Sequence, residues 1–235
     1  MLIPDKKQFL KGFIMAILFL VVLFVMFTPN FGGMNAFDAS DKLFNSIAKG
    51  STNYIERIRK ESAPFSSNPV DIKLELENHE MNGNAEKMLK VAGVEAVIDG
   101  DNIAVKGTLG KMVDAAIKDS EDMFYNRGDV VKNRYDVPEK EALFTWWQIF
   151  KATIKTFNND KRFKEAAMLE EVLSRGIGVG YNFYKIEPEK ASTKAGMLSF
   201  ALIFYIVYTL WWGFAIFFMA EGLGLQLAGG SKKEH

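Results

Sequence analysis

The sequence predicts an α+β membrane protein in which two transmembrane helices, one near each terminus, flank an extracytoplasmic domain. Three observations predict this fold class. A long apolar run lies near each end of the chain, a polar stretch separates the runs, and that stretch has apolar residues at both strand-like and helix-like spacing. The domain is expected to contain a small β-α-β-β-α unit and a helical hairpin.

The first apolar run covers residues 9–27, interrupted only by Lys11 and its neighbour, and the second covers residues 197–220 without any charge. An α-helix needs about 20 apolar residues to cross a bilayer core of roughly 30 Å. Transmembrane helices are therefore predicted at residues 9–28 and 195–220. A cleaved signal peptide would have a shorter apolar run and a small-residue cleavage site, which does not follow the first run closely, so an uncleaved anchor is expected.

Basic residues near the spans predict which side of the membrane each end faces. Lysines precede the first span and follow the second, whereas residues 29–41 carry no basic residue. Residues 1–8 and the tail 221–235 are therefore expected in the cytoplasm, and the domain in the periplasm of a bacterium, with both spans in the inner membrane. Lysines before the second span argue against this orientation, but long translocated loops largely escape the rule. The lysines concerned are Lys6, Lys7 and Lys11 at the first span, Lys232 and Lys233 after the second, and Lys185, Lys190 and Lys194 before it.

The composition excludes several classes of site. The chain has no cysteine, which rules out disulfides, thiolate metal sites, iron–sulfur clusters and covalently attached haem. It has 29 Lys and Arg against 29 Asp and Glu, so it lacks the basic footprint of a nucleic-acid-binding protein. With two histidines, one of them the terminal His235, a histidine-based triad or bis-histidine haem is not expected. We therefore expect no cofactor, no metal and no nucleic-acid partner.

Residues 29–64 are predicted to form a linker and an amphipathic helix. After a Gly-Gly break, Asp38 or Ser40 is a suitable N-cap for a helix that runs to about Lys60. Gly50 is expected to weaken and bend this helix near its middle. The apolar residues that fall on one stripe are Leu43, Phe44, Ile47, Tyr54, Ile55 and Ile58.

Residues 65–126 are predicted to form the small α+β unit. Apolar and charged residues alternate in its first strand, and the Asp-Gly-Asp-Asn segment from Asp99 tolerates the positive φ of a hairpin turn. The predicted elements are a strand at 70–76, a helix at 84–92 closed by Gly93, strands at 94–98 and 103–105, and a helix that Thr108 caps. This order resembles that of small ferredoxin-like metallochaperone domains, but their cysteine pair is absent, so no function is carried over.

Residues 127–194 are predicted to form the helical hairpin and a linker. A polar loop is expected at residues 125–135, and Asp136 is then expected to cap a helix that runs to about Phe157. After a turn, a second helix is expected from about residue 161 to residue 175. Apolar residues repeat at steps of three and four along both segments, which is typical of helices with one buried face.

Two motifs in the domain have a structural explanation that is stronger than the functional one. Gly176, Gly178 and Gly180 form a G-x-G-x-G, but a dinucleotide fingerprint needs a strand before it, and here a helix precedes it. Close packing or a flexible joint is expected instead. His79 lies in a polar loop with few other metal ligands nearby, so a solvated loop is expected there rather than a metal site.

Acidic residues gather on the helix that follows Thr108. Asp114, Asp119, Glu121 and Asp122 offer carboxylates for calcium, but the spacing of an EF-hand is absent. A solvated acidic face is therefore expected.

Trp146 and Trp147 lie side by side in the predicted helix of the hairpin. They are expected either in the domain core, on a helix at the membrane surface, or in contact with a partner subunit. In the surface arrangement, the indoles lie at headgroup level, and Lys140, Lys151 and Lys155 reach the lipid phosphates.

The second span carries an unusual cluster of polar aromatic residues near its middle. Tyrosine and tryptophan normally gather at the two membrane interfaces, and their buried polar groups need hydrogen-bond partners that lipid tails lack. Packing of the two spans against each other is one explanation, but a first span of Phe, Leu and Val offers no polar side chain to match. Contact with other integral membrane subunits is therefore favoured, and a lipid or quinone at a subunit boundary is an alternative. The candidate residues are Tyr205, Tyr208, Trp211, Trp212 and Gly213, with Thr209 beside them.

Two classes of function follow from these features. The first is a non-catalytic accessory or anchoring subunit of a multi-subunit membrane complex of the energy-coupling or transport type. The second is an extracytoplasmic sensor that signals laterally to a membrane partner, because the predicted cytoplasmic tail is too short for a signalling module. No catalytic constellation is present, so an enzyme is not expected.

Overall fold

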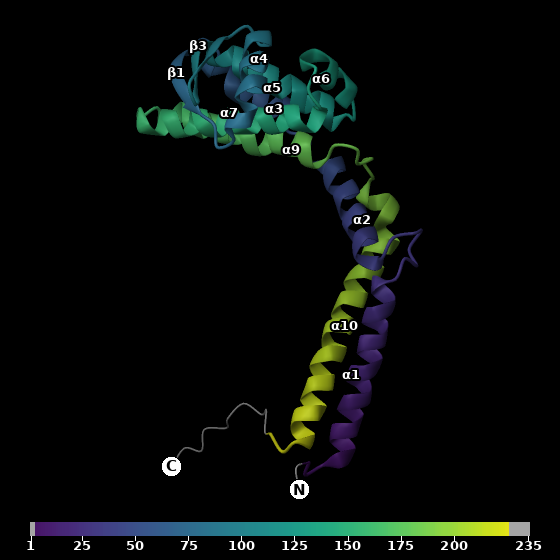
Figure 1. The fold of residues 1–235 in the computed structure, drawn as a ribbon. Helices are drawn as coiled ribbons and strands as arrows, with labels where there is room; N and C mark the ends of the chain where they lie inside the picture. The colour runs from purple at the N-terminus through teal and green to yellow at the C-terminus, as the bar shows by residue number, and fades with distance from the viewer. Residues whose placement is uncertain (1–2, 226–235) are drawn as a thin grey trace. The chain divides into compact units, whose positions relative to one another are not determined.

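The computed structural model describes residues 3–225, and this part of the chain is a mostly helical α+β protein with one three-stranded sheet (Figure 1). It divides into two compact units. The first is Met1–Ile47 together with Glu189–His235, and the second is Ala48–Pro188. We refer to them as the helix-pair unit and the domain unit. The α+β class predicted from the sequence is confirmed.

In the helix-pair unit, α1 (Lys6–Phe27) and α10 (Ala195–Gly222) lie side by side (Figure 1). Asp5 caps α1 because its carboxylate accepts the backbone N–H groups of Lys7 and Gln8 at 2.9 and 3.1 Å. Both helices are long and apolar enough to cross a membrane. Most of their apolar side chains are exposed, as expected for a surface that faces lipid or other helices rather than water.

Glycine allows the two helices to approach closely at one end of the pair. A Cβ atom on Gly12 would lie 2.6 Å from the carbonyl oxygen of Ala215 and 2.6 Å from the amide nitrogen of Met219. A Cβ atom on Gly222 would collide with the backbone of Phe9. Small residues at such contacts are the usual means by which membrane helices come together.

The linker region differs from the sequence prediction. α2 (Ala36–Ser51) begins after Asn35, whose side-chain oxygen accepts the Asp38 amide at 2.9 Å, so neither Asp38 nor Ser40 is the N-cap. The single bent helix expected to run to Lys60 is instead two helices, because the helix stops just after Gly50. α3 (Ile55–Ser62) then starts afresh and leads into a short 3₁₀ turn, Ala63–Phe65.

The domain unit contains the predicted β-α-β-β-α order, which the structure confirms. The sheet is antiparallel with strand order β1-β3-β2, so β3 lies in the middle and pairs Val105 with both Ile72 and Ala96. Residues of β1 alternate between exposed and buried, as the charge pattern predicted. The elements are β1 (Pro69–Glu75), a 3₁₀ turn (His79–Met81), α4 (Asn82–Val91), β2 (Glu95–Asp99), β3 (Asn102–Thr108) and α5 (Leu109–Phe124).

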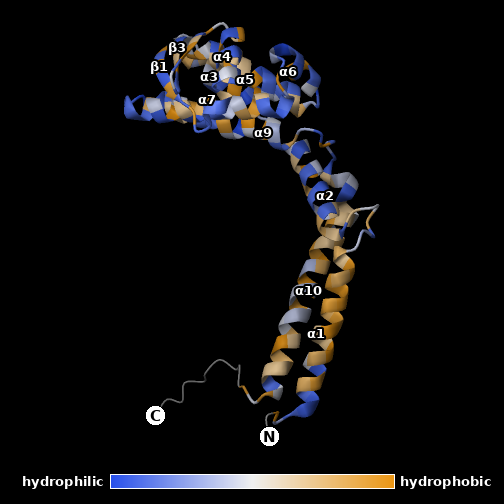
Figure 2. Cartoon of the chain, viewed as in Figure 1, coloured by the Kyte–Doolittle hydropathy of each residue, from blue (hydrophilic) through white to orange (hydrophobic). Residues whose placement is uncertain are grey.

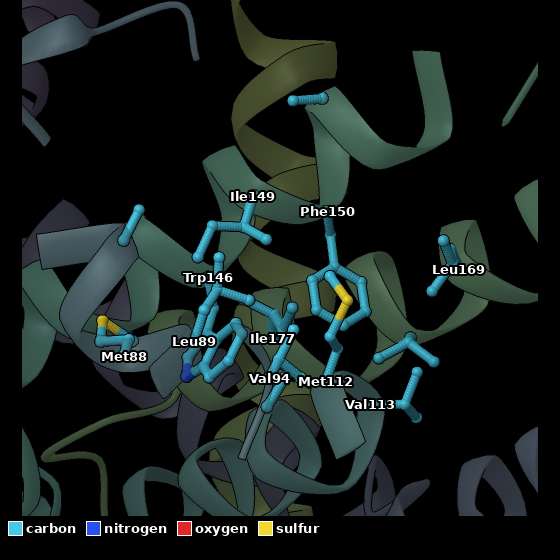
Figure 3. Packing of buried hydrophobic residues seen from close by; sticks show 14 of the residues in the cluster. Met88, Leu89, Val94, Met112, Val113, Trp146, Ile149, Phe150, Leu169 and Ile177 are labelled. Atoms are coloured by element: carbon cyan, nitrogen blue, oxygen red, sulfur yellow. The ribbon is translucent and has the colours of Figure 1, made fainter. Parts of the chain in front are cut away.

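Helices of the second half pack on this unit and complete one core. Figure 3 shows Met112 and Val113 of α5 beside Trp146 and Phe150 of α7, with Leu169 of α8 nearby. The two helices of the expected hairpin are present as α7 and α8. The elements are α6 (Gly128–Tyr135), α7 (Glu139–Asn159), α8 (Phe163–Glu171), a π-helical turn (Val172–Ile177) and α9 (Gly178–Asn182), with a 3₁₀ turn (Ala191–Lys194) before α10.

The prediction of a polar loop at residues 125–135 is wrong, because α6 occupies most of it. Val131 and Tyr135 are buried and give this short helix an apolar side that the sequence pattern hides among charges. Asp136 ends α6 in a left-handed conformation with φ of 52°, so it is not the N-cap of α7. α7 begins after Pro138 instead.

Candidate functional site

The polar aromatic residues of α10 divide into an inner and an outer group. On the inner side, the ring of Phe19 in α1 lies with its centroid 4.2 Å from that of Tyr208 and 4.6 Å from that of Trp212. Trp211 meets the same ring edge-on at 6.4 Å. Residues predicted to contact partner subunits therefore also hold the pair together.

Trp211 finds a polar partner within the pair. Its indole Nε1 donates a hydrogen bond to the backbone carbonyl oxygen of Met15 at 3.1 Å. Side chains in the central stretch of α1 offer no polar group, so this backbone partner was not expected from the sequence. A helical carbonyl has a second lone pair that can accept such a bond.

Tyr205 belongs to the outer group, with 67% of its surface exposed, and Trp212 is 38% exposed. Gly213 has no atom within 4 Å of the position of a Cβ, so it forms an open notch on the same helix. Within residues 3–225, neither the hydroxyls of Tyr205 and Tyr208 nor the indole N–H of Trp212 makes a hydrogen bond. Figure 2 colours the residues by hydropathy, and the middle of α10 is paler, and so less apolar, than the neighbouring α1.

Thr209 needs no partner. Its hydroxyl donates to the carbonyl oxygen of Tyr205 at 2.7 Å, one turn earlier in the same helix. The unsatisfied groups of this surface are therefore the two phenols and one indole.

Trp146 and Trp147 have different environments. Trp146 is fully buried in the domain core, so the surface or partner contact considered for it from the sequence is not possible in this fold. Trp147 is partly exposed and stacks on Phe144 with centroids 5.7 Å apart. Of the two, only Trp147 is available to a membrane surface or a partner.

Trp147 lies in a shallow apolar groove of about 200 Å³ between α7 and α9, which we call the α7/α9 groove. Lys140 lies over the ring of Tyr181 at 5.4 Å, and Lys151 lies over the ring of Trp147 at 4.8 Å. Lys151 also pairs with Glu77 at 2.6 Å. The groove is lined by Leu143, Phe144, Trp147, Ile177, Gly178, Tyr181 and Asn182.

The expected solvated acidic face on α5 is wrong for Asp119 and Asp122, which are buried. The Asp119 carboxylate accepts the Tyr135 hydroxyl and the Trp146 Nε1, each at 2.6 Å, and pairs with Arg134. Arg134 also binds Asp122 at 2.9 Å. Burial raises the pKa of Tyr135, so its hydroxyl stays protonated and keeps donating. These contacts neutralise a buried charge and fix α5, α6 and α7 together.

Of the three glycines in the run, Gly180 is the one that packs too closely for a side chain. Gly180 lies against α5, where a Cβ atom would be 2.7 Å from the carbonyl oxygen of Ser120. The run lies in a π-helical turn and α9 and follows α8, so the strand that a nucleotide fingerprint requires is absent from this position. His79 is in an exposed 3₁₀ turn beside the Asp101 carbonyl. Residues 3–225 contain no group of three His, Cys, Asp or Glu side chains placed to hold a metal.

Comparisons with known protein families, with curated proteins and with solved structures found no match to this chain. The candidate site therefore rests on its own geometry. Its strongest element is the outer surface of α10, where polar aromatic groups are exposed on an otherwise apolar helix.

Proposed function

We propose that this protein is a non-catalytic accessory subunit of a multi-subunit membrane complex of the energy-coupling or transport type. In this proposal α1 and α10 cross the inner membrane of a bacterium, both termini lie in the cytoplasm, and the domain unit lies in the periplasm. The length and apolar character of the two helices and the lysines beside them support this topology.

The observation that carries the proposal is the depth of the unsatisfied groups on α10. Leu18 is the middle residue of the apolar run 9–27, and its neighbour Phe19 contacts Tyr208. Tyr208 would therefore lie near the bilayer centre, and Tyr205, three residues away, only about 4.5 Å from it along the helix. Neither phenol reaches the headgroups from that depth.

An unpaired hydroxyl in an apolar medium costs roughly 2–7 kcal/mol, depending on the reference state. Lipid tails offer no acceptor, and α1 satisfies only Trp211. A neighbouring membrane subunit with a polar group at that depth would remove the cost. The notch at Gly213 would admit a side chain of the same neighbour, because nothing in the described chain fills it.

The α7/α9 groove is a second contact surface in this proposal. It contains partly exposed aromatic rings, which are enriched at protein interfaces, and a lysine lies at each end. Burial of Trp146 leaves Trp147 as its anchor.

The decisive experiment replaces Tyr205 by phenylalanine, which removes one hydroxyl and keeps the ring. Tyr205 contacts no ring of α1, so the helix pair should be unaffected, whereas association with the partner should weaken in a mild-detergent pull-down. Replacing Tyr205, Tyr208 and Trp212 together by leucine should abolish it, but this variant also removes two rings that stack on Phe19, so the Tyr205 variant decides between partner contact and helix-pair packing. A matched control changes the exposed aliphatic residues Leu202, Ile206 and Val207 to other aliphatic ones.

Three results would count against the proposal. One is a wild-type protein that purifies as a lone monomer while the triple variant keeps full cellular function. Another is a bound lipid or quinone lost from the Tyr205 variant with subunit contacts unchanged, which would assign the surface to a small molecule. The third is intact assembly with a lost response to an external stimulus, which would favour a sensor.

A further inference from the structure

The two ends of the domain unit are tied together at one point. The chain enters through the end of α2, which carries Lys49, and leaves through residues 183–188 after α9. Asn126, in the turn between α5 and α6, lies between them and contacts both.

Lys49 is a buried cation, with 3% of its surface exposed. Its Nζ donates to the Asn126 Oδ1 at 3.1 Å, to the Phe183 carbonyl at 3.0 Å and to the Ile186 carbonyl at 2.5 Å. These three acceptors match the three N–H groups of an ammonium. Burial lowers the pKa of Lys49, and the nearby Glu187 carboxylate partly opposes that shift.

Asn126 binds the exit segment with every polar atom of its side chain. Its Oδ1 also accepts the Lys185 amide at 2.8 Å, and its Nδ2 donates to the Ile186 carbonyl at 3.3 Å and to the Glu187 carboxylate at 3.0 Å. Asn126 and Lys185 both have a left-handed backbone, with φ of 60° and 64°. Non-glycine residues pay for that conformation, so the surrounding bonds must hold it in place.

These ties are polar and lie at the margin of the domain. The side-chain hydrogen bonds of Lys49 and Asn126 reach one another, the backbone of residues 183–186 and Glu187, and none of them reaches Met112, Trp146 or Phe150. Of the exit segment, Tyr184 belongs to the apolar core. Segments with few buried apolar contacts open at lower free energy than a packed core. The helix-pair unit has its own tie between the same two connecting segments, where the Glu189 amide donates to the Ser46 carbonyl at 2.9 Å.

We propose that Lys49, Asn126 and residues 185–187 form a latch that holds the entering and leaving segments of the domain unit together and opens while Tyr184 and the rest of the core stay packed. While the latch is closed, the two segments cannot slide past each other. When it opens, each segment moves on its own.

The test uses the full chain in lipid nanodiscs and follows hydrogen exchange at the Lys185 amide, which donates to Asn126. Lys49→Met keeps the side-chain length and removes the charge. Asn126→Ala removes the amide side chain that bonds both Lys49 and the leaving segment. Each variant should raise exchange in residues 185–187 about tenfold or more, because bonds to charged groups are lost. Lys42→Met, on the exposed side of the same helix, is the matched control and should change nothing.

A second readout measures the distance between the two segments. The chain has no cysteine, so cysteines introduced at the exposed positions Ser51 and Pro188 carry the only spin labels. The wild type should give one narrow distance distribution, and both latch variants a broader one, while exchange in α5 stays slow.

Two outcomes overturn the proposal. If both variants keep the narrow distance and slow exchange, the contacts do not restrain the segments. If both variants accelerate exchange throughout α5 as well, the contacts are part of the cooperative core and no separate latch exists.

Discussion

The indole Nε1 of Trp211 donates a hydrogen bond to the backbone carbonyl of Met15, 3.1 Å away. Tyr205, less than two turns earlier in the same helix, is 67% exposed and has no such partner among residues 3–225. The two residues have different environments on α10: Trp211 is hydrogen-bonded to α1, and Tyr205 is exposed.

The contact at Gly12 predicts that a glycine-to-alanine change separates the helices there, whereas the same change at Gly213 does not. Gly12→Ala places a Cβ atom 2.6 Å from backbone atoms of α10, so the helices must separate, whereas Gly213→Ala meets nothing. Short-linker crosslinking between cysteines at positions 8 and 221, whose native side chains are 3.1 Å apart, should fall in the first variant only. Equal crosslinking in both would mean that the helices do not approach at Gly12.

The proposed topology predicts which side of the membrane reaches each part of the chain. A cysteine at the exposed position Asp160 should react with a membrane-impermeant maleimide in cells with a permeable outer membrane. A cysteine at Lys6 should react only after the inner membrane is opened. Because the wild type has no cysteine, the background is zero. The reverse labelling pattern would disprove the orientation.

The buried carboxylate of Asp119 predicts a strong effect on the stability of the domain. Asp119→Asn removes one of the two carboxylates that bind Arg134, and because Asp122 remains, the loss is about 1.5–3 kcal/mol. Thermal unfolding followed by near-UV circular dichroism should show the loss. Asp114→Asn, on the exposed side of the same helix, should stay within about 0.5 kcal/mol of the wild type.

The ionised carboxylate of Glu139 is predicted to stabilise the domain, and protonation in acid is predicted to remove that stabilisation. Its own backbone N–H lowers the pKa of the carboxyl, and the Tyr184 hydroxyl and the Lys185 ammonium add to that shift while burial opposes it. A carboxyl with a lowered pKa in the folded state stabilises the fold above its unfolded pKa of 4.5 and loses that contribution as the pH falls through the folded value.

Glu139→Gln should therefore flatten the fall in unfolding temperature below about pH 4.5. Glu95→Gln, at an exposed position on β2, is the control and should keep the wild-type slope. An unchanged slope in Glu139→Gln would show that this carboxyl titrates alike in both states.

The α7/α9 groove predicts a loss of partner binding without loss of fold. If the proposed partner binds this groove, Trp147→Ala should weaken the association, because tryptophans often supply much of the binding energy at interfaces. Phe163→Ala removes an isolated aromatic side chain that is 62% exposed and serves as the control. Binding to anionic vesicles lost in Trp147→Ala, with partner capture unchanged, would instead assign the groove to the lipid surface.

The regular elements could be predicted because their signals are local. The alternation of β1 and the Asp-Gly turn before β3 each depend on a few adjacent residues, and both appear in the structure as expected. Helix ends were harder, because Asn35, Asp38 and Ser40 are all suitable cap residues and lie within six positions of one another.

The candidate sites could be predicted only in part, because burial of a polar residue depends on contacts distant in sequence. Asp119 looks like any surface carboxylate until Arg134 and Trp146 are brought to it from α6 and α7. Lys49 is hidden in the same way, since its acceptors at Phe183 and Ile186 lie more than a hundred residues later. The aromatic cluster of α10 was visible because it departs from the usual composition of an apolar helix.

The tie between Glu189 and Ser46 places the two segments that lead to the domain unit next to each other. In terms of chain topology, the domain is an insertion into the loop of a helical hairpin. The two ends of the inserted domain lie next to each other, so the loop between α1 and α10 does not need to lengthen to hold it. The contacts between α1 and α10 can therefore form whatever the size of the inserted domain. The hairpin and the domain are therefore free to diverge separately, and a change in the membrane contacts of one need not be matched by a change in the core of the other.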